Sequence, residues 1–95
     1  MRNDDQIEYW NGKAGETWAR MQERMDKALA PVTAALLSLA APQAGQHVLD
    51  IGCGTGETTL AIAGAVGGEG GVLGLDVSEP MLARARERAA ALLSD

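Results

Sequence analysis

The sequence predicts an α/β fold that contains the N-terminal half of a doubly wound parallel sheet, and three observations support this. Two short apolar runs, His47–Ile51 and Val72–Val77, have the length and composition of buried parallel strands. A helical pattern follows each run, and a glycine-rich turn joins the first run to its helix. The resulting order of helix, helix, strand, helix, strand and helix contains one βαβ crossover and the beginning of a second.

The N-terminal part of the chain is predicted to be mostly helical. Residues 1–15 are polar and are expected to form a mobile arm with one helical turn at Asp5–Trp10. From Trp18 onwards, apolar residues recur at spacings of three or four, which indicates an amphipathic helix. Proline is tolerated in the first turn of a helix but not in its interior, so Pro31 predicts two helices that meet near Ala30.

The chain is therefore expected to consist of a helical lead-in, residues 1–43, and the first βαβα portion of a ligand-binding domain, residues 44–95. In that second part a helix is predicted over Glu57–Val66, where a run of glycines follows. Ser78 is a residue type that caps helices, and the apolar spacing after it predicts a last helix that runs almost to Asp95.

The composition of the chain disfavours several classes of function. The formal net charge is −5 and the basic residues form no stripe, so nucleic acid is not expected as a partner. No apolar run reaches about 18 residues and the first residues lack the features of a signal peptide, so no membrane partner and a cytoplasmic location are expected. No cluster of histidine, cysteine and carboxylate predicts a metal site.

The segment Asp50–Gly56 joins the first strand to its helix through glycines at alternate positions. Without Cβ atoms, Gly52, Gly54 and Gly56 allow a tight turn and let a ligand touch the main chain. A dinucleotide-binding fingerprint would require a third glycine where Glu57 stands, and the negative charge of Glu57 is expected to disfavour a pyrophosphate. A phosphate-binding Walker loop is excluded, because no Gly-Lys-Ser/Thr follows.

Asp76 ends the second strand, roughly 20 residues after the glycine loop, where doubly wound folds place an acid that binds ribose hydroxyls. Cys53 is interpreted as a small packing residue and not a nucleophile, because only His47, at the far end of the first strand, could activate it. The arginines of the last helix are interpreted as a solvated face, namely Arg84, Arg86 and Arg88.

The two strand regions together carry a family resemblance. VLDIGCGTG, Val48 to Gly56, and VLGLDVSEPML, Val72 to Leu82, resemble the first two motifs of class I S-adenosylmethionine-dependent methyltransferases, with the spacing that the family keeps. More loosely, YWNGKAGETW, Tyr9 to Trp18, resembles the N-terminal region of small-molecule methyltransferases of the ubiquinone and menaquinone biosynthesis type. The resemblance implies a Rossmann-like domain, of which this chain holds only the N-terminal portion.

The resemblance also implies S-adenosyl-L-methionine as the cofactor and assigns residues to it. Asp76 would bind the ribose hydroxyls, Val77 and Met81 would lie against the adenine, and Trp10 or Trp18 would help to close the pocket. The methionine portion would be held by the first strand and its loop, at Asp50, Gly52, Cys53, Gly54 and Gly56.

The implied reaction is in-line methyl transfer to a small-molecule acceptor, for which no catalytic residue is identified. One alternative is a non-catalytic fragment or an oligomerising interaction module that retains the loop, and another is an NAD-type nucleotide-binding domain. Because two parallel strands leave exposed edges, we expect a truncated chain that self-associates or pairs with a missing C-terminal half.

Overall fold

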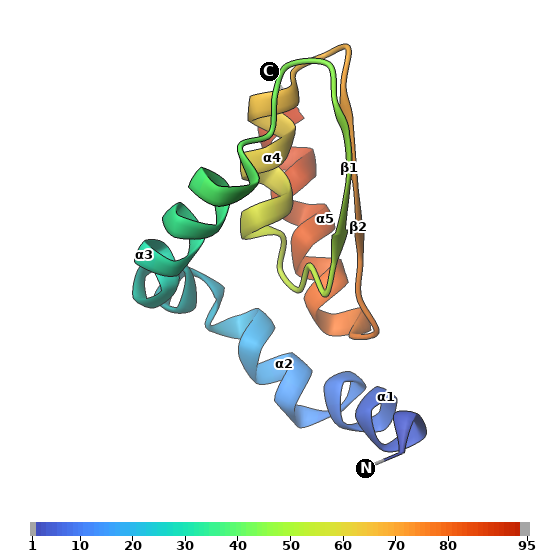
Figure 1. The fold of residues 1–95 in the computed structure, drawn as a ribbon. Helices are drawn as coiled ribbons and strands as arrows, with labels where there is room; N and C mark the ends of the chain where they lie inside the picture. The colour runs from blue at the N-terminus through green and yellow to red at the C-terminus, as the bar shows by residue number, and fades with distance from the viewer. Residues whose placement is uncertain (1, 94–95) are drawn as a thin grey trace.

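The computed structural model describes residues 2–93, which form five helices and two strands (Figure 1). This content confirms the predicted α/β class. The elements in chain order are α1 (Asn3–Asn11), α2 (Lys13–Arg20), α3 (Gln22–Ala40), β1 (His47–Ile51), α4 (Glu57–Val66), β2 (Gly71–Leu75) and α5 (Glu79–Leu93).

The two strands pair in parallel, as the βαβ pattern predicts, with a register that runs from His47 opposite Gly71 to Ile51 opposite Leu75. Helices α4 and α5 both lie on the same side of this sheet (Figure 1). On that side Ile62 and Val66 of α4 form a small buried core. The covered face therefore carries the hydrophobic packing of the α/β unit.

The opposite face of the sheet is apolar and open to solvent. Side chains alternate between faces along a strand, so Leu49 and Ile51 share this face with their register partners Leu73 and Leu75. Their exposed fractions are 54%, 78%, 60% and 47%, in that order. A contiguous bare apolar surface of this kind is typical of a site that packs against other protein.

The expectation of a mobile N-terminal arm is wrong. Residues 3–20 form α1 and α2, which are separated by a break at Gly12. At the start of α1 the Arg2 N–H donates to the Asp5 carboxylate at 3.3 Å, and α2 packs along α5. Tertiary packing thus orders a segment whose polar sequence predicted little structure.

The predicted break at Pro31 is also wrong, because Pro31 lies inside α3, a single helix of 19 residues. Proline has no N–H, so the Lys27 carbonyl lacks its usual helical hydrogen bond. Both residues lie on the exposed side of α3, where water can bond to this carbonyl. The actual breaks fall at Met21, between α2 and α3, and at Ala41, which adopts a left-handed conformation with φ of 44°.

The remaining elements agree closely with the sequence predictions. Helix α4 spans Glu57–Val66 as expected, and Ser78 caps α5 by accepting a hydrogen bond from the Met81 N–H at 3.4 Å. The second strand ends at Leu75, two residues earlier than predicted. The division into residues 1–43 and 44–95 stays a prediction, and its first position and its last two positions lie outside the described residues.

Candidate functional site

The glycine loop crosses the carboxyl end of the sheet. The N–H groups of Gly52 and Cys53 both donate to the Leu75 carbonyl at the end of β2, over 2.7 and 3.0 Å. Gly52, Gly54 and Gly56 have φ values of 77°, 55° and 91°, a left-handed conformation that other residues rarely adopt. The alternate glycines are therefore required by the turn itself, as the sequence predicts.

Asp76 connects the loop to the start of α5. One carboxylate oxygen accepts the Gly54 N–H at 2.8 Å, and the other accepts the Ser78 N–H at 2.9 Å. A carboxylate has about four acceptor positions, so these bonds leave acceptor capacity on both oxygens. The two sequence motifs thus meet at one carboxylate, which also faces a cavity.

A cavity of about 550 Å³ lies at the carboxyl ends of β1 and β2. Its volume is within the usual range for a small-molecule site, and parallel α/β sheets bind ligands at this edge. The sheet side is lined by Ile51, Gly52, Gly54, Leu75, Asp76, Val77 and Met81, and the N-terminal helices supply Gln6, Trp10 and Trp18. Five of the eight predicted cofactor contacts are thus brought together around one space.

The other three predicted contacts lie away from that cavity. The Asp50 carboxylate accepts a hydrogen bond from Thr59 Oγ1 of α4 at 2.6 Å, on the covered face of the sheet. Cys53 and Gly56 line a second hollow of about 430 Å³, which is bounded by β2, α4 and α5. Their direct contact with a ligand stays a prediction, and the structure gives them a place in the support of the loop.

The environment of Cys53 disfavours a thiolate. Burial raises the pKa of the Cys53 thiol, and the negative charges of Asp76 and Asp50 raise it further. A thiol with a raised pKa stays protonated at neutral pH and is a weak nucleophile. This environment agrees with the interpretation of Cys53 as a packing residue.

Comparison with known proteins identifies the segment that carries the loop. The profile of a family described as a methyltransferase domain matches residues 48–94. The match covers just under half of this chain. Demethylmenaquinone methyltransferases are similar to the chain: that of Shouchella clausii (strain KSM-K16) is 59% identical over 49 residues, and that of Bacillus cereus (strain B4264) is 50% identical over 50 residues. These matches cover 52% and 53% of this chain.

Solved methyltransferase structures share the fold of this segment. A protein-L-isoaspartate O-methyltransferase matches with a TM-score of 0.60 and 25% identity, over 67% of this chain and 20% of that chain. A SAM dependent methyltransferase from Aquifex aeolicus matches with a TM-score of 0.56 and 32% identity, over 63% of this chain and 32% of that chain. The class I resemblance is thereby confirmed for the N-terminal portion of the domain.

The chain spans 21% of the length of each of the two curated methyltransferases named above. Within residues 2–93, no helix is both long and apolar enough to cross a membrane. In the same residues, no group of three or more His, Cys, Asp and Glu side chains is placed to hold a metal ion.

The negative charge of Glu57 has a partner in this segment. Glu57 was expected to repel a pyrophosphate, but its carboxylate pairs with Arg88 of α5 at 3.0 Å. The pair neutralises the charge of Glu57, and Glu57 does not line the cavity at the strand ends. The preference against a dinucleotide therefore cannot rest on Glu57.

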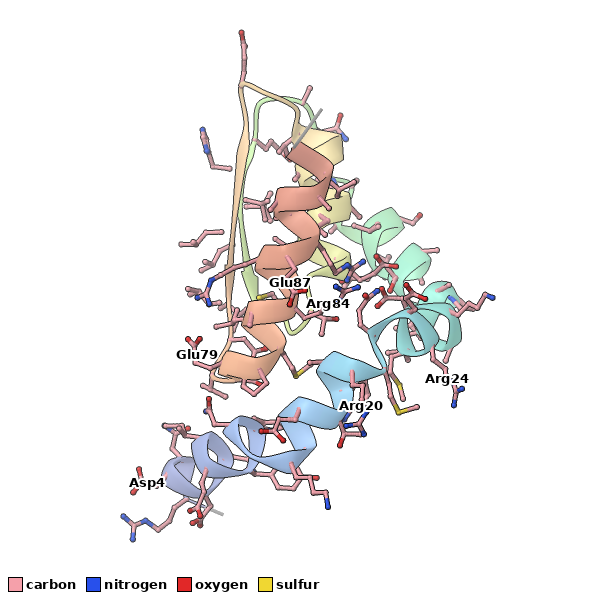
Figure 2. The ribbon with its side chains drawn as sticks, turned by 180° about the vertical axis from the view of Figure 1, so that it is seen from behind. Asp4, Arg20, Arg24, Glu79, Arg84 and Glu87 are labelled. Carbon is pink, nitrogen blue, oxygen red and sulfur yellow. The ribbon has the colours of Figure 1, made fainter. Side chains whose placement is uncertain are left out.

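The interpretation of the α5 arginines as a solvated face is correct only for Arg86, whose side chain is 66% exposed. Arg84 donates two hydrogen bonds to the buried Gln22 at the start of α3, and Figure 2 shows it at the junction of these helices. Arg88 donates to the Thr55 carbonyl inside the glycine loop at 2.8 Å and also pairs with Asp26 of α3. These arginines tie α3 and the loop to α5.

Sequence reasoning missed Arg88 and Gln6 as residues of the site and its support. The partners of Arg88 lie 31 or more positions away in the sequence, and Gln6 lies in a segment expected to be mobile. No local pattern signals either role. Trp10 and Trp18, which the resemblance implied, do line the cavity.

Proposed function

We propose that the cavity at the strand ends binds S-adenosyl-L-methionine, and that this segment is the cofactor-binding part of an enzyme that methylates a small molecule. The observation that carries the proposal is the Asp76 carboxylate, which joins the glycine loop to the start of α5 and lines the cavity with acceptor capacity to spare. A ribose diol offers the two O–H donors that such a carboxylate accepts.

The residues present fit the cofactor. A Cβ on Gly52 would meet no atom within 4 Å, so the backbone there faces open space in which the methionine portion can lie. Gly54 approaches the Met81 side chain so closely that a Cβ would lie 2.9 Å from its methyl carbon. In this arrangement Gly52 and Gly54 hold the methionine portion, Asp76 the ribose, and Val77 and Met81 the adenine.

The remaining predicted contacts act through the loop in this proposal. Asp50 fixes the start of the loop through Thr59, and Cys53 and Gly56 shape its return into α4. The bound cofactor supplies an activated methyl group on a sulfonium, and the protein supplies orientation for in-line attack. The demethylmenaquinone methyltransferases are named for a small-molecule acceptor, which supports that acceptor class here.

Titration calorimetry with S-adenosylhomocysteine tests the proposal, with Asp76→Ala as the informative variant. Removal of this carboxylate leaves the ribose hydroxyls unpaired, so binding should weaken by about 1–3 kcal/mol. Asp4→Ala is the matched control, because that carboxylate is 76% exposed at the outer end of α1 (Figure 2). Absence of heat at millimolar ligand would refute binding by this chain, and tighter binding of NAD would favour the dinucleotide alternative.

The bare face of the sheet supports a further part of the proposal, which concerns partners. We propose that Leu49, Ile51, Leu73 and Leu75 pack against the rest of a methyltransferase domain, because the relatives are about five times as long as the matched region. Two strands with one covered face are not expected to be stable without further packing. Addition of the complementary part of a relative should raise the melting temperature of the chain, whereas a stable homodimer would favour self-association.

A further inference from the structure

The Asn11 side chain at the C-terminal end of α1 is hydrogen-bonded to the start of α5. The Asn11 amide donates to the Val77 carbonyl at 2.6 Å and to the Ile7 carbonyl at 2.7 Å, and its oxygen accepts the Glu79 N–H at 2.9 Å. Glu79 is the first residue of α5, so Asn11 supplies a partner to a helix terminus from a helix 66 or more positions earlier. This bridge lies next to Asp76 and Val77 in the sequence.

A buried hydroxyl fastens the same two helices. Ser78 is fully buried, and its Oγ donates to the Trp10 carbonyl at 2.5 Å. Gly15 of α2 allows this approach, since a Cβ there would lie 1.9 Å from the Trp10 carbonyl oxygen and 2.6 Å from Ser78 Oγ. We refer to Asn11, Ser78 and Gly15 together as the latch.

The latch adjoins two indole side chains, Trp10 and Trp18, which line the same cavity as the glycine loop and are called the indole wall below. Trp10 precedes Asn11 directly, its Nε1 donates to Gln6 at 3.2 Å, and its ring lies edge-on to Trp18 at a centroid distance of 6.4 Å. All three side chains line the same cavity as Gly52 and Asp76. The wall belongs to α1 and α2, whereas the loop belongs to the sheet, so their separation depends on how α1 is attached to α5.

We propose that Asn11 is a positioning residue for the cofactor site, because it sets the distance between the indole wall and the glycine loop. The proposal rests on the proposed function, and it names an adenosyl ligand, whose purine offers a flat face to Trp10 and Trp18. Without the Asn11 bridge, α1 retains its contacts with α2 and the Ser78–Trp10 hydrogen bond, but loses its hydrogen bonds to Val77 and Glu79. The Trp10 side chain is then held near the loop less firmly, because one cross-helix hydrogen bond remains where the wild-type chain has three.

The test is a titration with S-adenosylhomocysteine, followed by calorimetry and by tryptophan emission. Asn11→Ala should weaken binding by about tenfold, in line with the loss of the two hydrogen bonds that join α1 to the start of α5. It should also reduce the change in emission at saturating ligand, because the indoles are no longer held against the purine. Asn3→Ala, the same substitution at the exposed end of α1, should match the wild-type chain in both readouts.

Asn11→Asp keeps the experiment informative if Asn11→Ala does not fold. The carboxylate still accepts the Glu79 N–H at the positive end of α5 but cannot donate to the Val77 or the Ile7 carbonyl, so the helix start keeps its partner and the chain should bind more weakly. Equal affinity and equal emission change in Asn11→Asp and the wild-type chain would overturn the inference alone. Absence of binding in the wild-type chain would overturn the proposed function and, with it, this inference.

Discussion

Replacement of Arg88 by methionine should destabilise the chain far more than the same replacement two residues earlier. The Arg88 side chain is 16% exposed, and its guanidinium bonds Thr55, Glu57 and Asp26 over 2.8–3.1 Å. Hydrogen bonds to charged groups contribute about 1.5–3 kcal/mol each, and a fully buried carboxylate left unpaired costs about 3–5 kcal/mol. Asp26 is 17% exposed and Glu57 is 40% exposed, so water recovers part of this loss. We expect a net loss of about 2–3 kcal/mol.

Urea unfolding followed by far-ultraviolet circular dichroism measures this loss, and Arg86→Met is the matched control. Methionine retains most of the alkyl packing of arginine, so the comparison isolates the guanidinium. Arg86 pairs with Glu79 at the surface, where exposed ion pairs contribute about 0–1 kcal/mol. A difference between the two variants below about 0.5 kcal/mol would refute the reasoning. In a double-mutant cycle, Asp26→Ala should cost less in the Arg88→Met background than in the wild-type chain.

Three further predictions concern other parts of the structure. In urea unfolding, Gly64→Ala should stabilise the chain by about 0.5–1 kcal/mol, because a Cβ there meets no atom within 4 Å. Gly15→Ala should destabilise the chain by at least about 2 kcal/mol, because its Cβ would lie 1.9 Å from the Trp10 carbonyl oxygen, and equal effects of the two variants would contradict this packing. Folding raises the pKa of the Cys53 thiol, so the free energy of unfolding should fall as pH rises from the unfolded-state pKa to the folded-state pKa of this thiol. The rate of alkylation by iodoacetamide should therefore rise at higher pH in the folded chain than in urea, and a lower pH midpoint in the folded chain would contradict the raised pKa. Ile51→Lys on the bare sheet face should abolish the rise in melting temperature that the complementary part of a relative produces, and an unchanged rise would place the contact elsewhere.

Predictions that depend on local sequence agree with the structure. Alternate glycines specify left-handed backbone at Gly52, Gly54 and Gly56, because only glycine adopts it without a steric penalty. The helix Glu57–Val66 and the cap at Ser78 follow from signals within a few residues. The convergence of the loop and Asp76 also follows from the sequence, since parallel strands bring their carboxyl ends to one edge.

Features that depend on distant partners were decided by tertiary structure alone. The sequence determined an α/β segment with a glycine loop, an acid at the end of its second strand and the resemblance to class I methyltransferases. It could not show that Asn11 fastens α1 to α5, that Arg88 neutralises Glu57, or that α3 passes through Pro31 without a break. Each of these depends on burial or on a contact across many positions of the chain, and residue spacing and propensity carry no information about either until the elements are packed.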